Sequence, residues 1–515
     1  MEGFLLDPSH PTIATIAQGN GFATAAFVGA RVLAKSFGLA HGFGHYDDDM
    51  GSQPDDEDLT GTVAERRAGV VTQRALDWLQ GNRGKRFFLW THYFDPHAPY
   101  DPPEPYKRTY ARDAYSGEIA YMDQEVGRLF EGLRQMGLED QTLVAVLGDH
   151  GESLGEHGEM THGVFLYDST MRVPFLLAGP GVPHGKVIQE QVRSIDVMPT
   201  LLAFLNLAPG PEAQGISLWP RIEKELRLPS LSYSYGETLY PRTYMGWSEL
   251  RAMRTDSWKL IVAPHPELYD LEQDPGEAHN LFAESPGEAA RLRKKLLEVA
   301  GDFSRPQKVS VKPVDEKTLR DLQSLGYVGA GPRREIALGT KAPDPKDRAA
   351  VLKIFGQVED LLNKKQYAPA ARAAEQALRL DPTNPRAHLY LATAYEQMLQ
   401  YPRAVEVLQH AADAGIDAER IYSRLGIDYL HLQRMDQAVA ALERAARLNP
   451  MDLRNLLNLG MAYLQQNRPQ DAERTFRAII AQNGRYAPAH NGLGIVAAQR
   501  GDAEGARREF QSAME

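Results

Sequence analysis

The sequence predicts an α/β domain, a three-layer sandwich with a mostly parallel sheet, followed by an all-α superhelix. Two short apolar runs in the first half of the chain each end in a group of polar side chains, as parallel strands do at a ligand-binding edge. In the last third of the chain, alanine recurs every 34 residues, a spacing typical of stacked helix pairs. The length of 515 residues also suits two or three domains.

The first apolar run covers residues 142–147 and is followed, after Gly148, by Asp149 and His150. A continuous apolar run that stops at glycine predicts a parallel strand buried on both faces. Carboxylate oxygen and imidazole nitrogen together suit zinc, manganese or, with added oxygens, a calcium-type ion. The pair is therefore a candidate metal site. The alternative is a glycine-rich acidic surface loop whose histidines are solvated.

The second apolar run, residues 87–90, leads into a loop that contains His92, Asp95 and His97. The two loops can converge only if their strands are neighbours in one sheet, which short parallel connections permit. Prolines on both sides of His97 restrict the backbone and fix the direction of its side chain. We therefore expect His97, rather than His92, to reach the site; a turn histidine without a role is the alternative.

Residues 149–181 resemble the sulfatase branch of the alkaline-phosphatase superfamily. In that branch an Asp-Asn or Asp-His pair is followed by a basic residue and then by Arg-Val-Pro, which stands here at residues 172–174. The resemblance implies that Asp149 and His150 are ligands of one divalent metal ion, with calcium, manganese and zinc not distinguished. It also places His162 where a substrate-contacting Lys or His is expected.

Residues 96–99 resemble the Pro-His-x-Pro segment of the same family. The resemblance implies that His97 contacts the sulfate or protonates the leaving group. His97 and His162 are therefore the candidate catalytic residues.

The start of the chain departs from the family pattern. Residues 5–48 resemble the part of a sulfatase that follows the nucleophile segment, so we expect the α/β sandwich to be incomplete at its amino terminus. Ser9 lies too close to the next family segment to be the nucleophile, and we interpret it as the N-cap of a helix over residues 12–18. No nucleophile is identified. Arg31 is the candidate substrate-binding residue, because a basic pair stands near this position in many sulfatases.

The repeats in the last third resemble tetratricopeptide repeats, because small residues stand where two helices would cross closely. Glycine precedes the last three of the recurring alanines by twelve residues. Stacked repeats of this kind form a superhelix whose concave groove can bind a protein or peptide partner. The recurring alanines are Ala370, Ala404, Ala438, Ala472 and Ala506.

These features divide the chain into three predicted parts. Residues 1–327 form the sulfatase-like catalytic domain, which lacks its nucleophile segment. Residues 328–347 have no periodicity and are rich in glycine and proline, as linkers are. Residues 348–515 form the tetratricopeptide domain with about five helix pairs.

Composition excludes several classes of protein. A formal net charge of −11 and the lack of a dense basic cluster argue against nucleic-acid binding. The absence of cysteine excludes disulfides and thiolate metal sites. No apolar stretch reaches the ~18 residues of a membrane span. If the chain is complete as written we expect it in the cytoplasm, whereas an upstream segment with a signal would make it periplasmic or membrane-anchored.

The expected function is the metal-dependent hydrolysis of sulfate esters by a protein that also carries an interaction module. The chain as written is expected to be impaired, because the nucleophile and two metal-binding carboxylates of the family are missing. One alternative is a hydrolase or transferase of phosphate mono- or diesters in the same superfamily. The other is a non-catalytic tetratricopeptide interaction protein with a remnant hydrolase domain.

Overall fold

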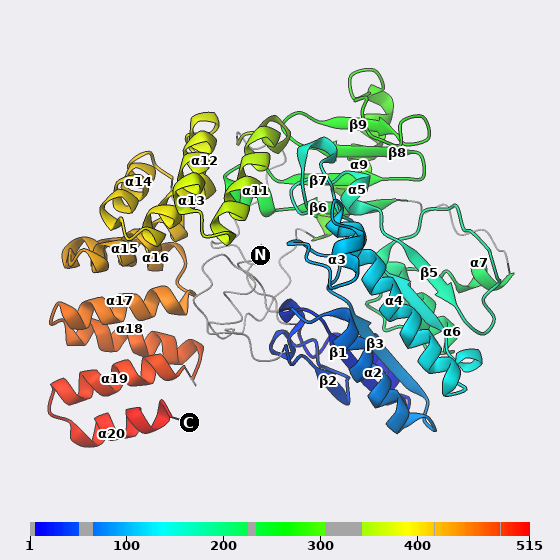
Figure 1. Ribbon diagram of the computed structural model, residues 1–515, viewed down its shortest axis with the longest axis horizontal. Helices are drawn as coiled ribbons and strands as arrows, with labels where there is room; N and C mark the ends of the chain where they lie inside the picture. The colour runs from blue at the N-terminus through cyan, green and yellow to red at the C-terminus, as the bar shows by residue number, and fades with distance from the viewer. Residues whose placement is uncertain are drawn as a thin grey trace.

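The computed structural model describes residues 6–50, 65–224, 233–303 and 342–514, apart from residues 417 and 485. An α/β domain is followed by helices that form an arc from α11 to α20 (Figure 1). The predicted linker, residues 328–347, lies mostly outside the described residues, so the predicted domain boundaries stay predictions. Among the described residues, no helix has the length and apolar composition needed to cross a membrane.

A parallel three-stranded sheet forms the first part of the α/β domain. Its strand order is β2-β1-β3, and the central strand β1 is almost fully buried. Phe27 of β1 packs with Val71 and Ala75 of helix α2, which explains why the apolar positions of α2 recur at helical spacing. The prediction of an α/β fold with a parallel sheet is confirmed. The bounds are α1 (Ile13–Gly19), β1 (Ala23–Val28), β2 (His45–Asp47), α2 (Ala68–Asn82), β3 (Phe87–His92) and α4 (Ala114–Gln135).

The strand before Asp149 differs from the prediction. Strand β4 (Val144–Leu147) pairs antiparallel with β5 (Phe175–Ala178) in a separate two-stranded sheet, rather than with parallel neighbours. It is not buried on both faces, because Val146 is 38% exposed and its cross-strand partner Leu176 is 58% exposed. An apolar run indicates a strand, but it does not indicate which strand pairs with it.

Strands β3 and β4 are nevertheless held close together without sharing a sheet. Val144 packs with Phe87 against an apolar cluster formed by Leu79 of α2, Leu133 of α4 and Leu138. The expectation that β3 and β4 are neighbours in one sheet is therefore wrong among the described strands. Side-chain packing on α2 and α4, at the amino ends of the two strands, replaces hydrogen bonding in holding them together.

The first helix begins at a different residue from the one expected. Thr12, not Ser9, is the N-cap of α1, since its hydroxyl accepts a hydrogen bond from the backbone N–H of Thr15 at 3.1 Å. The side chain of Thr15 accepts in return from the Thr12 N–H, which completes a reciprocal capping box. Ser9 instead lies in a turn in which its N–H donates to Asp7.

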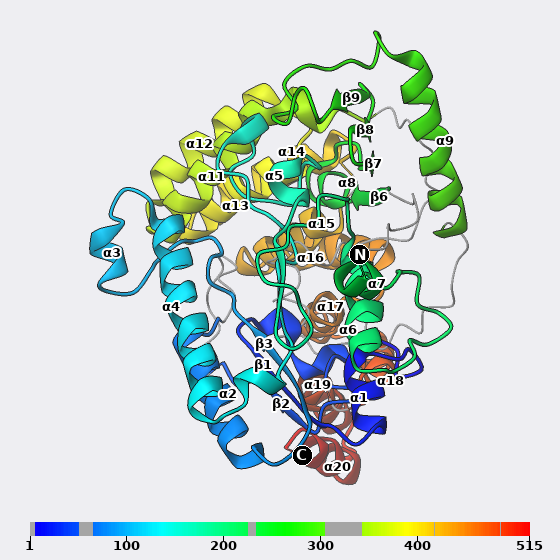
Figure 2. The same ribbon diagram turned by 90° about the vertical axis from the view of Figure 1, so that its right-hand side faces the viewer.

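A four-stranded antiparallel sheet, with the order β6-β7-β8-β9, follows. One face packs against α9, where Met253 and Leu260 meet Leu292 and Leu296. Figure 2 shows α9 along one side of the domain. The bounds are β6 (Ser234–Thr238), β7 (Leu250–Arg254), β8 (Trp258–Val262), β9 (Glu267–Asp270) and α9 (Pro286–Phe303).

Short helices connect these elements. The α-helical ones are α3 (Tyr106–Thr109), α5 (Asp168–Met171), α6 (Val197–Phe204), α7 (Trp219–Lys224) and α8 (Tyr240–Met245). The 3₁₀ turns are η1 (Arg31–Leu33), η2 (Lys35–Phe37), η3 (Glu139–Gln141), η4 (Glu156–Gly158), η5 (Ser194–Asp196) and η6 (Pro345–Arg348).

The carboxyl-terminal helices follow one another in five consecutive pairs. The recurring alanines are buried, and small residues let the helices approach closely: a Cβ added to Gly426 would lie 2.6 Å from the Leu442 side chain. The pairs are α11 (Ala349–Asn363) with α12 (Tyr367–Leu380), α13 (Pro385–Gln397) with α14 (Tyr401–Asp413), α15 (Glu419–His431) with α16 (Met435–Leu448), α17 (Leu453–Gln465) with α18 (Pro469–Gln482), and α19 (Ala487–Gln499) with α20 (Ala503–Ser512).

The two parts of the chain share one apolar core. The face of the β6–β9 sheet opposite α9 contributes Ala252, Ile261 and Tyr269 to a cluster that continues into Val351 and Phe355 of α11. The first helix pair is therefore packed against the α/β domain rather than separated from it.

We predict that Ala438→Leu destabilises the full chain by ~1–3 kcal/mol through overpacking. Ala438 is fully buried on α16, whereas Ala440 on the same helix is exposed. Calorimetric melting of the Ala438→Leu and Ala440→Leu variants checks this. Equal melting temperatures for the two variants would contradict the packing assignment.

Candidate functional site

Three histidines from two loops form a compact group, which we call the histidine cluster: His97, His150 and His162. His97 follows β3, whereas His150 and His162 follow β4. The ring centres of His150 and His162 are 4.0 Å apart, and His97 lies 5.2 Å from His162 and 6.4 Å from His150. The structure thus brings together three of the four residues for which the sequence predicts a catalytic or metal-binding role, and Asp149 adjoins them.

His97 is held in one tautomer by its neighbour. Its Nδ1 lies 2.7 Å from the carbonyl oxygen of Ala98, and since a carbonyl only accepts, Nδ1 must carry the proton. Its Nε2 is therefore an acceptor in the neutral ring. Burial, together with the nearby His162, lowers the pKa of His97 to about 4, so the ring is neutral at neutral pH.

The other two members of the cluster follow the same pattern. His150 donates from Nδ1 to the carbonyl oxygen of Gly151 at 2.9 Å. His162 donates from Nδ1 to Glu152 Oε1 at 3.1 Å, and the Glu152 carboxylate is almost completely buried. Each imidazole thus keeps Nε2 available for a ligand, in the arrangement that usually orients metal-binding and catalytic histidines.

Asp149 and His150 could supply two donors to a metal ion. Asp149 Oδ2 lies 3.8 Å from His150 Nε2, and the Asp149 side chain is 75% exposed. Among the residues that the structure describes, no group of three or more potential ligands is arranged to hold a metal ion. A calcium-type ion takes 6–8 oxygen ligands, so this pair fits part of a coordination shell and not a whole one.

His92 lies beside this pair but is not oriented like the cluster. Its Nδ1 accepts a hydrogen bond from the Gly29 backbone N–H at 3.4 Å. Burial lowers its pKa, while the negative charge of Asp149 opposes the shift. His92 therefore links β3 to the end of β1 and is not a member of the histidine cluster.

A buried carboxyl group supports the loop that carries His97. Glu118 of α4 accepts hydrogen bonds from the backbone N–H groups of His97 at 3.2 Å and Asp101 at 2.7 Å. Asp95, in the same loop, accepts from the Ala68 N–H at the start of α2 at 2.9 Å. Burial raises the pKa of Glu118 to about 7, although the backbone donors oppose the shift.

The remaining predicted residues are Arg31 and Ser9. Arg31 begins η1, shortly after β1, and its role in substrate binding stays a prediction. Ser9 is exposed, and its hydrogen bond to Asp7 lies within its own turn. No nucleophile is identified among the described residues.

Family models match both parts of the chain. The Sulfatase model matches residues 4–207, and the model named "N-sulphoglucosamine sulphohydrolase, C-terminal" matches residues 155–302. Tetratricopeptide repeat models match residues 361–423, 423–471 and 457–515. The chain joins a sulfatase domain to tetratricopeptide repeats.

Individual relatives agree with this assignment over part of their length. The chain is 35% identical to choline-sulfatase of Rhizobium meliloti over 181 residues, which are 34% of each protein. It is 30% identical to arylsulfatase K of Bos taurus over 203 residues, or 36% of each. The matched part therefore spans about a third of these relatives. A solved structure of a putative sulfatase from Bacteroides fragilis has a TM-score of 0.48 and 18% identity, over 59% of this chain and 80% of that chain.

The sequence predicts no role for two carboxyl groups that support the site, those of Glu152 and Glu118. Glu152 stands two residues after His150, and this closeness to the histidines is the only signal that could have indicated it. Glu118 lies 21 residues after His97, within α4, and no motif surrounds it, so nothing in the sequence indicates its role. Both act through contacts that depend on the folded arrangement of loops.

We predict that the free energy of unfolding decreases from about pH 5 to about pH 8, and that Glu118→Gln reduces this decrease. The pKa of Glu118 is raised from 4.5 to about 7 in the folded state, so over this interval the folded chain holds a proton that the unfolded chain has released. Denaturant unfolding at several pH values measures the effect.

The control for this prediction is Glu131→Gln on the same helix. Arg134 holds the pKa of the exposed Glu131 carboxyl below its usual value, so its titration lies below the interval. An equal pH dependence in wild type and Glu118→Gln would show that Glu118 is not the titrating group.

Proposed function

We propose that the chain is a hydrolase of sulfate esters that works with one divalent metal ion. The observation that carries the proposal is the histidine cluster, in which three imidazoles from two loops each donate from Nδ1 to an oxygen and leave Nε2 available. The sulfatase domain assignment supports the substrate class.

His97 and His162 are proposed to act on the ester itself. Neutral His97 can accept a proton at Nε2, because its Nδ1–H is engaged by Ala98. An anionic ester bound beside the ring favours the protonated imidazolium, which can then donate a proton to the leaving oxygen. His162 is kept in the matching tautomer by Glu152, so its Nε2 can contact the sulfate group or a transferred proton.

Asp149 and His150 are proposed to hold part of the metal shell. A bound divalent ion would neutralise the charge on the ester oxygens and act as a Lewis acid. The exposed Asp149 carboxylate is accessible to such an ion, and the free Nε2 of His150 faces no competing hydrogen bond among those described. Calcium, manganese and zinc are all consistent with these donors.

The chain as written is proposed to turn over slowly. Covalent hydrolysis needs an activated nucleophile, and none is identified near the histidine cluster among the described residues. Two ligands also bind a cation less tightly than a full shell. The tetratricopeptide repeats are proposed to bind a protein or peptide partner in their groove, as stacked helix pairs present an extended concave surface.

We predict slow release of product from aryl sulfates that depends on added calcium, manganese or zinc and disappears in Asp149→Ala. Aryl phosphates, assayed in parallel, distinguish the phosphate-ester alternative. Asp140→Ala is the matched control, because Asp140 is exposed and lies shortly before β4 rather than after it. It should keep the wild-type rate.

Other outcomes of this assay have defined meanings. Fast turnover that vanishes in Asp149→Ala would show that the chain carries its own nucleophile, and Ser9 would be the first candidate to mutate. Turnover that is unchanged in Asp149→Ala would contradict the proposed site. Complete inactivity with every metal and both esters would favour a non-catalytic interaction protein.

A further inference from the structure

The loop that carries two of the three clustered histidines is in contact with the first helix of the repeats. We call residues 149–163 the histidine loop; it includes the turn η4. At the tip of the loop, a Cβ added to Gly158 would lie 2.8 Å from the Cβ of Ala349, the first residue of α11. The backbone of the loop therefore rests directly on α11, and Gly158 has no room for a side chain on this side.

The backbone at this contact is in an unusual conformation. Gly158 has φ of +85°, and His157 before it has φ of +53°, which is uncommon for a residue other than glycine. The His157 ring stacks on Tyr167, with ring centres 3.5 Å apart and an angle of 13° between the planes. Such conformations persist only where the surroundings hold them.

Tyr167 extends this support to the repeats. Its hydroxyl donates to the Glu267 carboxylate at 3.1 Å, and Glu267 lies 3.3 Å from Lys346 Nζ, just before α11. The Tyr167 ring belongs to the same apolar cluster as Val351 and Phe355 of α11. One continuous set of contacts thus runs from the histidine loop to the start of the repeat array.

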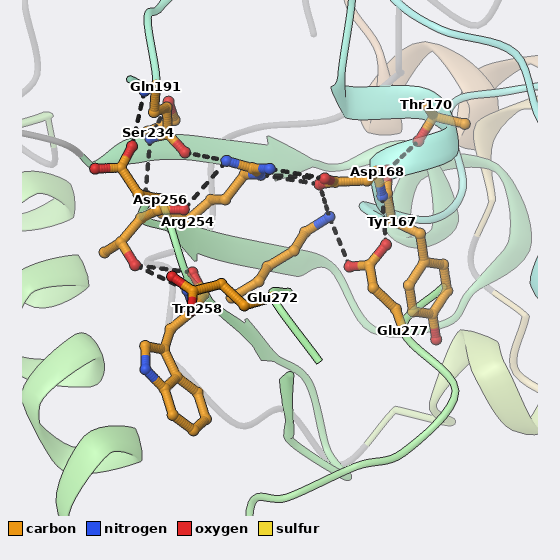
Figure 3. A network of polar contacts seen from close by, with 12 residues as sticks. Tyr167, Asp168, Thr170, Gln191, Ser234, Arg254, Asp256, Trp258, Glu272 and Glu277 are labelled. Atoms are coloured by element: carbon orange, nitrogen blue, oxygen red, sulfur yellow. Dashed lines mark hydrogen bonds and ion pairs between the residues drawn. The ribbon is translucent and has the colours of Figure 1, made fainter. Parts of the chain in front are cut away.

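The chain that follows the histidine loop is fixed within the sulfatase domain. Asp168, which follows Tyr167, forms ion pairs with Arg254 and with the buried Lys259, both at 2.9 Å (Figure 3). Its backbone N–H donates to Glu277 at 2.6 Å. Burial alone would raise the pKa of Asp168, but the two cations lower it to about 2, so the carboxylate stays charged. All these partners of Asp168 lie within the sulfatase domain.

The attachment of α11 to the sulfatase domain is also specific. The buried Asp344 accepts hydrogen bonds from the backbone N–H groups of Lys346 at 3.0 Å and His265 at 2.9 Å. The indole N–H of Trp247 donates to Asp381 at 2.7 Å, at the end of α12. These contacts fix the position of the first helix pair, so it can in turn fix the tip of the loop.

We propose that the first tetratricopeptide helix pair is a positioning element of the candidate active site, in which Ala349 supports Gly158 and thereby sets the position of His150 and His162. That α11 supports the loop is independent of the function of the site. That this support affects catalysis rests on the proposed hydrolase function. Ala349 and Lys346 are positioning residues, since neither belongs to the histidine cluster.

The test compares Ala349→Leu with Ala350→Leu in the full chain. Both changes add the same side chain at the start of α11, but Ala350 is exposed, whereas Ala349 faces Gly158. Hydrogen–deuterium exchange followed by peptide mass spectrometry measures the amides of residues 152–163. We expect about tenfold faster exchange in Ala349→Leu, with unchanged protection of β6–β9, and wild-type exchange in Ala350→Leu.

Lys346→Met is the second variant, for the case that Ala349→Leu does not fold. It removes the ion pair with Glu267, together with the contacts of Lys346 Nζ to Asp344 and to the His265 carbonyl oxygen, and it changes no residue of α11. Faster exchange confined to residues 152–163 is again expected. Unchanged exchange in the loop, or an equal increase across the whole domain, would overturn the proposal. Ester hydrolysis, measured on the same samples, should show a lower kcat in Ala349→Leu than in wild type. If the wild-type chain hydrolyses no ester, the proposed hydrolase function is contradicted. The exchange result alone then decides whether α11 supports the loop.

Discussion

The shared apolar core between the β6–β9 sheet and the first helix pair is the constraint on which the arrangement of the chain depends. Each face of that sheet needs a cover, because its strands alternate apolar residues on both sides: Met253 and Leu260 face α9, whereas Ala252 and Ile261 belong to the cluster that continues into α11. The second face is covered by a cluster that includes Phe165, Tyr167 and Trp247 and continues into α11. The first helix pair therefore completes an apolar core that begins on the sheet of the sulfatase domain.

A feature of this fold could be predicted from the sequence where it depends on residues close together in the chain, and not where it depends on contacts between distant segments. The repeats were predictable because the alanines at 34-residue spacing record packing between neighbouring helices. The two polar groups after β3 and β4 were predictable because a strand end and the loop that follows it are adjacent in sequence. The antiparallel pairing of β4 with β5 was not, because strand choice depends on contacts between distant segments.

The same distinction applies within the site. The sequence could indicate His97 and His150, since proline and glycine beside them mark their loops. It could not indicate Glu118, whose role exists only because α4 places its carboxyl group under the His97 loop. Nor could it indicate the tautomers, which are fixed by a carbonyl for His97 and by the buried Glu152 for His162. Such supporting contacts hold catalytic groups in place without a local sequence pattern.

The position of α11 also limits how a partner on the repeats could affect chemistry in the sulfatase domain. A bound partner changes a distant site only if it favours one arrangement of the structure between the two over another. In a repeat array each unit contacts its neighbours, so a partner bound to α17–α20 would act through every intervening helix pair. A partner bound to α11 or α13 would act more directly on α11, the helix that touches Gly158. The tight packing of Ala349 against the loop leaves little room for gradual adjustment. A movement of α11 would therefore shift η4, which lies between His150 and His162 in the chain, more directly than it would shift the anchored Asp168.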